Sequence, residues 1–150
     1  MKFKNFIKIF FAILFVFVST NSYAKTIKWS MQGDSLTLDP HAQNEGPTTQ
    51  VSRQVYEALV TRGLDMSIEP QLATDWKTTD PNTWIFNLRK DVKFSDGSNM
   101  TAKDVVFSIL RAKQPTSDFK EYISTISSVK AIDKYTIQIK TSKPNPILLN

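Results

Sequence analysis

The stretch from Ile68 to Arg111 constrains the fold most, because strand, turn and helix signals follow one another there in close succession. Apolar and polar side chains alternate over residues 84–89, which is typical of a strand with one buried face. The Ser-Asp-Gly97 sequence predicts a turn, and Thr101 with Asp104 three positions later matches the pattern of a capping box that opens a helix. We therefore expect strands of a sheet with an amphipathic helix beside them.

Further strands and a second helix are predicted on both sides of that stretch. Val51, Val55 and Leu59 share one face of a helix, and the last hairpin has a short Asp133-Lys134 turn followed by an alternating second strand. Two amphipathic helices against an antiparallel or mixed sheet make an α+β fold. The additional elements are strands at 26–31, 73–78 and 92–94, a helix from Thr48 or Thr49 to about Val60 that Gly63 closes, and paired strands at 128–132 and 135–140.

The first 24 residues have the layout of a signal peptide. Three lysines precede an unbroken apolar run of ten residues, 9–18, and Ser22 and Ala24 are small residues at the positions that a signal peptidase requires. A membrane anchor is the alternative, but a bilayer-spanning helix needs about 20 apolar residues. We expect residues 1–24 to be a cleaved signal peptide, residues 25–150 to be the mature chain, and its location to be periplasmic.

Charge and composition exclude several function classes. The formal net charge is +5, and it falls to +2 when the three lysines of the signal peptide leave. No cluster of lysine and arginine remains in the mature chain, so nucleic acid is not expected as a partner. The absence of cysteine removes lipid attachment through an N-terminal cysteine, disulfides and thiolate metal sites. No Gly-rich phosphate loop is present, so a nucleotide cofactor is not expected.

Asp39 and His41 are the only residues that suggest catalysis, with Ser35 nearby. A nucleophile triad needs these groups to converge from different elements beside an oxyanion site, and here all three belong to one loop. We therefore expect no enzyme activity and interpret Asp39-Pro40 as the start of a turn. A single histidine without a second ligand at metal-binding spacing indicates no metal site, and no cofactor is expected.

The aromatic residues and Arg89 each allow two interpretations. Trp84 and Phe86 lie on one face of a strand, which favours a place in the core over the lining of a ligand cleft. Trp29, Trp76 and Tyr56 can either pack or line a cleft, and the sequence does not decide between them. Arg89 is expected to be solvated or ion-paired, with the binding of a ligand carboxylate by its fork as the alternative.

Four motifs in a fixed order give the chain a family resemblance. They are Leu-Ala-x-x-Trp76, Trp-x-Phe-x-Leu-Arg89, Val-Lys-Phe-x-Asp-Gly97 and Thr-Ala-x-Asp-Val-x-Phe-Ser108. In this order they resemble the N-terminal part of the extracytoplasmic solute-binding proteins, family 5, of peptide, oligopeptide and nickel ABC importers. The resemblance is looser over residues 38–41 and 55–59, and it covers essentially the whole mature chain.

The resemblance implies the N-terminal part of a two-lobed clamp that closes on its solute. It implies a small-molecule solute, a short peptide first and nickel or another solute second. It also implies docking on an ABC permease in the inner membrane, with a monomer at full length. In the family, the loop that corresponds to residues 38–46 faces the cleft, so Asp39, His41 and Asn44 are the expected ligand-binding residues.

Residues 25–150 are thus expected to be an incomplete family domain, unable to bind solute alone. A truncated gene, a gene cut at the end of a contig or a split gene would each explain that length. The alternative is a stand-alone secreted α+β interaction module with no transport role. The apolar run Ile147-Leu148-Leu149 favours the fragment, because it has the composition of a new element and is expected to be exposed and to promote association. The downstream nucleotide sequence would distinguish the two.

Overall fold

The computed structural model describes residues 26–149, so the expected signal peptide lies outside the described part. The chain divides into a unit of residues 1–30 and a unit of residues 31–150, and every helix and strand below belongs to the second. No helix within residues 26–149 is long and apolar enough to cross a membrane. The elements are α2 (Gly46–Val55), β1 (Val60–Arg62), β2 (Ile68–Pro70), β3 (Ala73–Asp80), β4 (Thr83–Leu88), α3 (Ala102–Ala112), β5 (Ile126–Ala131) and β6 (Thr136–Thr141).

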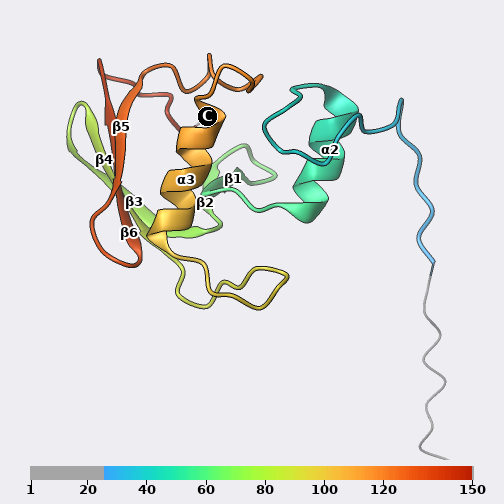
Figure 1. Cartoon of the computed structure of the whole chain (residues 1–150), viewed down its shortest axis with the longest axis horizontal. Coiled ribbons are helices and arrows are strands. Elements are labelled where there is room, and N and C mark those ends of the chain that lie inside the picture. Colours follow the sequence, from blue (N-terminus) through green and yellow to red (C-terminus); the bar gives the residue numbers. More distant parts are fainter. Residues whose placement is uncertain (1–25, 150) are drawn as a thin grey trace, which may run out of the picture. The chain divides into compact units, whose positions relative to one another are not determined.

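A four-stranded antiparallel sheet in the order β3-β4-β6-β5 is the centre of the unit, and α3 lies along one of its faces (Figure 1). The last strand, β6, runs between β4 and β5. Phe86 on β4 pairs with Ile137 on β6, and Trp84 pairs with Ile139. Cross-strand pairs of this apolar kind stabilise a sheet. The α+β prediction is confirmed, with a sheet that is antiparallel throughout.

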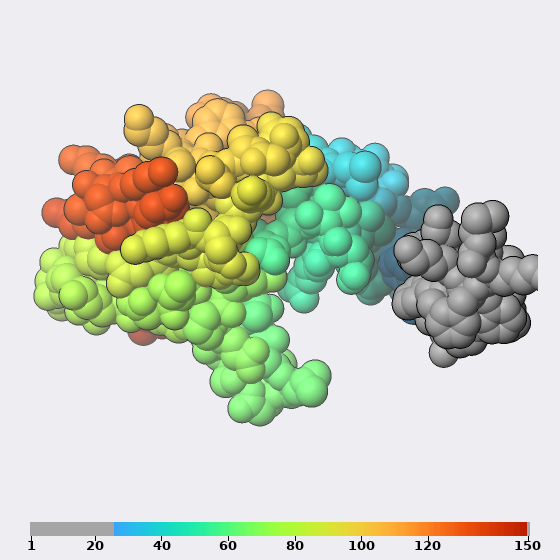
Figure 2. All heavy atoms as spheres, turned by 90° about the horizontal axis from the view of Figure 1, so that it is seen from below, coloured from blue at the N-terminus to red at the C-terminus, as the bar shows by residue number. Residues whose placement is uncertain are grey.

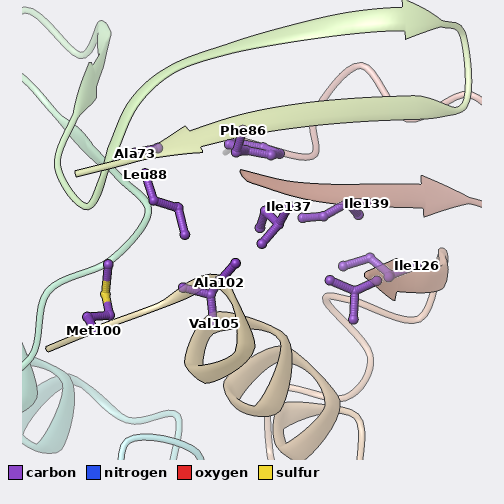
Figure 3. Packing of buried hydrophobic residues seen from close by; sticks show 10 residues of the cluster. Ala73, Phe86, Leu88, Met100, Ala102, Val105, Ile126, Ile137 and Ile139 are labelled. Carbon is purple, nitrogen blue, oxygen red and sulfur yellow. The ribbon is translucent and has the colours of Figure 1, made fainter. Parts of the chain in front are cut away.

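The core fills the space between α3 and the sheet. Figure 3 shows Ala102 and Val105 of α3 directed at the side chains of the central strands. Phe86 is 1% exposed and Ile137 is 0% exposed, so the alternation predicted for both strands is confirmed. The buried cluster consists of Ala73, Phe86, Leu88, Met100, Ala102, Val105, Ile126, Val129, Ile137 and Ile139.

The predicted start of α3 is also confirmed. The Asp104 carboxylate accepts hydrogen bonds from the backbone N–H of Thr101 at 2.7 Å and from its hydroxyl at 2.8 Å. The first bond satisfies a backbone N–H at the start of the helix, and the second holds the Asp104 carboxylate in place. Of the apolar stripe predicted for this helix, Leu110 is the exception, because it is 46% exposed.

Three predicted turns have the expected chemistry. The carboxylates of Asp80, Asp96 and Asp133 each accept a hydrogen bond from the backbone N–H two residues later, at 2.7 to 2.9 Å. Gly97 has a φ of +87°, which favours glycine. Residues 92–94, however, form no strand. They make a single bridge, between Lys93 and Asn99, because the turn reverses the chain before a longer ladder can form.

Residues 26–31 are predicted as a strand, and that prediction is wrong. They adopt no regular structure, and Ile27 and Trp29 are 85% and 62% exposed. Alternation supplies an apolar face, but a strand also needs a partner for its backbone hydrogen bonds. None of the described strands pairs with this segment.

The first predicted helix has different ends in the structure. It begins at Gly46, ahead of Thr48, and ends at Val55. Thr48 is buried and ties down the preceding loop, because its hydroxyl oxygen accepts the N–H of Leu36 at 3.0 Å. The C-terminal end is early because the carbonyls of Ala58 and Leu59 accept hydrogen bonds from residues 71–73. Tertiary pairing therefore overrides the helical pattern.

Gly63 belongs to a hairpin and does not close a helix. Its N–H donates to the carbonyl of Ser67 at 2.9 Å, and its own carbonyl accepts from Met66 at 3.0 Å. This turn joins β1 to β2, and the hairpin stands out as a green lobe in Figure 2. Leu64 at its tip is fully exposed.

The expected exposure of the run 147–149 is only partly confirmed. Ile147 is 65% exposed, whereas Leu148 and Leu149 are half-buried against the core cluster. These two leucines pack against the core cluster because burial of apolar surface is favourable, and the full burial of an aliphatic side chain contributes about 1.5–3 kcal/mol. The run therefore offers one exposed apolar side chain where three are expected.

Candidate functional site

Asp39 is paired with an arginine that lies 72 positions further along the chain. Arg111, in the last turn of α3, donates from Nη1 to Oδ1 at 2.8 Å and from Nη2 to Oδ2 at 2.5 Å. The planar guanidinium matches the two carboxylate oxygens, which gives a bidentate pair of defined orientation. The pair joins the loop before α2 to the end of α3.

His41 belongs to the same cluster. Its Nδ1 lies 3.0 Å from Nη1 of Arg111. A guanidinium can only donate, so Nδ1 is the acceptor and the ring proton is on Nε2. The backbone N–H of His41 donates to Oδ1 of Asp39 at 3.0 Å, and its carbonyl accepts the N–H of Asp118 at 3.0 Å. Both the ring and the backbone of His41 are therefore fixed.

The cluster has a defined charge state. The hydrogen bond from Arg111 and then that from the backbone of His41 hold the pKa of Asp39 well below its usual range. Burial, followed by the positive charge of Arg111, lowers the pKa of His41, and Asp39 opposes that shift. Asp39 in turn raises the pKa of Arg111. At neutral pH one anion, one cation and a neutral imidazole lie together, so their summed charge is zero.

Asn44 is held separately. Its side-chain nitrogen donates to the hydroxyl of Tyr122 at 2.9 Å, and Asn44 itself is exposed. The Tyr122 ring lies beside that of Phe119, with centroids 6.0 Å apart. The three predicted site residues thus fall into two groups. Asp39 and His41 both contact Arg111, whereas Asn44 is hydrogen-bonded to Tyr122.

A hollow of about 480 Å³ lies between the loop, α2 and α3. His41 is part of its lining, whereas Asp39 and Asn44 are not. The wall is mainly apolar, with polar groups from α2 and the segment after it. Its lining residues include Pro40, His41, Gln43, Arg53, Tyr56, Glu57, Leu59, Leu72, Val105, Ile109 and Phe119.

The residues considered for catalysis do not converge. The Ser35 hydroxyl donates to the carbonyl of Thr37 at 2.7 Å, and His41 Nδ1 faces Arg111. In the part of the chain that the structure describes, no group of three or more histidine or carboxylate side chains could hold a metal ion. The cluster at Asp39 can fix a loop and present a polar surface, and it has no arrangement suited to nucleophilic attack.

Arg89 is ion-paired, as the first interpretation predicts. It makes two hydrogen bonds to Asp91, from Nε at 3.2 Å and from Nη2 at 3.1 Å, and lies 3.7 Å from the Glu57 carboxylate. Its fork is therefore occupied within the chain. The core interpretation also holds for the strand aromatics, because Phe86 is buried and Trp84 packs beside it, as does Trp76.

Arg111 and Tyr122 are the two site residues that the sequence pattern does not reveal. Arg111 follows the apolar stripe of α3 and can be interpreted as an ordinary cation at a helix C-terminus. Tyr122 lies in a segment without periodicity. Their partners are 72 and 78 positions away, and a local pattern carries no information about such pairs.

The comparisons with known proteins agree with one another. The family model "Bacterial extracellular solute-binding proteins, family 5 Middle" matches residues 67–150. The periplasmic oligopeptide-binding protein OppA of Escherichia coli K12 is 34% identical over 129 residues, which are 73% of this chain and 24% of OppA. The chain thus spans about a quarter of the length of the curated relatives it matches.

Two solved structures show the same similarity. MoaA of A. tumefaciens R10, in complex with mannopinic acid, is 37% identical with a TM-score of 0.72, over 77% of this chain and 25% of MoaA. NikZ of Campylobacter jejuni, in complex with Ni(L-His), is 33% identical with a TM-score of 0.60, over 63% of this chain and 20% of NikZ.

Proposed function

Since the chain belongs to the bacterial extracellular solute-binding proteins of family 5, we propose that it supplies the N-terminal part of the periplasmic substrate-binding component of an ABC-type importer. The observation that carries the proposal is the 34% identity to an oligopeptide-binding protein over most of the chain. A short peptide is the first candidate solute. The structures of MoaA and NikZ hold other small solutes, which makes a nickel complex or another small molecule the second.

The loop with Asp39, His41 and Asn44 is proposed to be the wall that faces the solute in this N-terminal part of the binding protein. Its side chains are polar and partly exposed, and each is held by a residue of the segment 111–122. A small-molecule site combines an apolar wall with a few fixed polar groups. The hollow beside His41 has that composition.

One wall is insufficient for capture, so the proposed binding requires the rest of a family-length protein. Small-molecule sites typically enclose about 70–90% of the surface of a drug-sized ligand. Polar groups that stay hydrated on an open wall contribute little to affinity. The permease of the importer is the proposed macromolecular partner, and the assembled protein is proposed to be a monomer.

Export is part of the same proposal, with residues 1–24 as the signal peptide. Its small residues Ser22 and Ala24 place cleavage after Ala24. We expect mass spectrometry of periplasmic material to find a chain that begins at Lys25. A chain that keeps Met1 and stays in the inner membrane would contradict this.

A chimera tests the proposed function. Residues 25–150 replace the matching segment of the oligopeptide-binding protein of E. coli, and calorimetry measures the binding of short peptides. We expect one-to-one binding, weakened by Asn44→Ala and unchanged by Lys103→Ala, which alters an exposed side chain on α3. A chimera that unfolds cooperatively but binds no peptide or other small solute would contradict the proposal and favour a stand-alone interaction module.

A further inference from the structure

The segment 111–122 holds the loop before α2 at three points. Arg111 binds the Asp39 carboxylate with both ends of its fork. The N–H of Asp118 donates to the carbonyl of His41, and the hydroxyl of Tyr122 accepts from Asn44. Arg111 and Tyr122 use their side chains, and Asp118 uses its backbone. The contact of Arg111 with Asp39 is the only ion pair among the three.

The ion pair of Arg111 and Asp39 fixes the orientation of the Asp39 carboxylate more than it stabilises the fold. The side chains are 41% and 33% exposed, and partly exposed ion pairs contribute little to the free energy of unfolding. The fork, however, fixes both carboxylate oxygens, and one of them also accepts the backbone N–H of His41. The Asp39 carboxylate makes the turn to His41 locally, and Arg111 adds a restraint on the orientation of that carboxylate. A lysine would supply the charge without the two fixed donors.

We propose that Arg111 is a positioning residue, which orients Asp39 and His41 and thereby shapes the wall that the loop offers to a solute. The solute-facing role of the wall rests on the function proposed above, whereas the positioning itself does not. Arg111 contacts His41 as well as Asp39, so a single side chain determines the direction of one ring and one carboxylate.

His41 provides a direct probe because it is the only histidine of the chain. The charged groups nearest to its ring are Arg111 and Asp39, and Arg53 and Glu57 line the same hollow. Arg111 disfavours the imidazolium in two ways: its charge repels a second cation, and its N–H needs the lone pair of Nδ1. Asp39 favours the imidazolium. Removal of Arg111 should therefore raise the pKa of His41, and removal of Asp39 should lower it.

The test is an NMR titration of His41 in the full secreted chain, prepared without a histidine tag. We expect Arg111→Gln to raise the pKa of His41 and Asp39→Asn to lower it, with Arg111→Lys between wild type and Arg111→Gln. Lys103→Gln, an exposed substitution on the same helix, should leave the pKa at its wild-type value. A rise in both the Arg111→Gln and Asp39→Asn variants, as general loosening would produce, would overturn the proposal.

Hydrogen exchange separates positioning from a general structural role. We expect Arg111→Gln to accelerate exchange several-fold at the amides of His41 and Asp118, with no change at Phe86 and Ile137 in the sheet. Unchanged exchange in the loop, or equal acceleration in the sheet, would overturn the positioning role. Neither measurement involves a solute, so a failure of the proposed transport function leaves both results interpretable.

Discussion

At the scale of the residue, Asp39 combines a local and a long-range interaction. Its Oδ1 accepts the N–H of His41, two residues later, and both of its oxygens accept from Arg111 across the fold. Each hydrogen bond favours the ionised carboxylate, and together they outweigh the desolvation that acts against it. Asp39 therefore stays ionised in the folded chain well below the pH at which an ordinary carboxyl group takes up a proton.

The first prediction concerns acid stability. The pKa of Asp39 in the folded chain lies below its ordinary value of 3.8, so the unfolded chain binds the proton first. The contribution of Asp39 is complete above about pH 5 and is lost as the pH falls further. We expect Asp39→Asn to lose less stability than wild type between about pH 5 and pH 2. Urea unfolding at each pH measures the difference, and parallel curves would contradict the assignment.

Single residues also show which parts of the site can be predicted from the sequence. The turns at Asp80, Asp96 and Asp133 are predictable because each carboxylate binds a backbone N–H two residues away. Asp39 looks the same in the sequence, and its turn is predictable too. Its bond to Arg111 is not, since nothing near either residue specifies the other.

At the scale of the element, α3 connects the core to the candidate site. Its first turn is capped by Asp104, one face packs on the sheet through Ala102 and Val105, and its last turn carries Arg111. Figure 3 shows Ala102 and Val105 on the side of the helix that faces the sheet. A helix fixed at its start and along one face holds its end in a defined place.

The second prediction concerns the cap of that helix. Asp104→Ala removes the acceptor for the backbone N–H and hydroxyl of Thr101. Loss of a capping interaction typically costs about 1 kcal/mol. We expect urea unfolding to give a free energy of unfolding lower by that amount, whereas Lys103→Ala, next in the sequence and exposed, should change the free energy by less than about 0.5 kcal/mol. Equal effects of the two substitutions would show that the cap contributes nothing.

The third prediction concerns the centre of the sheet. Ile137 is 0% exposed and faces Phe86 across the strand pair. We expect Ile137→Ala to lower the free energy of unfolding by about 2–5 kcal/mol through the cavity it leaves. Ile132, 55% exposed in the turn before β6, is the control, and Ile132→Ala should cost no more than about 0.5 kcal/mol. A small effect at Ile137 would mean that the core lies elsewhere.

Prediction of the elements succeeds where sequence and tertiary pairing agree. The strands β4 and β6 carry their own alternation, and β3, β4, β5 and β6 all find their partners within the chain. The segment 26–31 has the alternation without a partner among the described residues. The residues after Val55 have helical spacing, but the backbone at 58–59 pairs with residues 71–73. Local periodicity cannot show whether a partner exists.

At the scale of the whole molecule, the chain corresponds to about a quarter of the relatives it matches. The folded unit has its own core between α3 and the sheet. Its candidate site is one polar loop beside an open hollow. A clamp exchanges an open for a closed state, and closure requires a second wall that moves against the first. Under the proposed function, the folding of this unit and the capture of a solute are therefore separate properties.

Calorimetry of the secreted chain against mixed di- to pentapeptides tests most directly whether these residues form one wall of a shared site. We expect a folded chain, shown by a cooperative thermal transition, that gives no measurable heat of peptide binding. The physical reason is that one wall leaves most of a peptide's surface in water. Micromolar binding with one-to-one stoichiometry by the secreted chain alone would contradict the account, because it would make this unit a complete binding module.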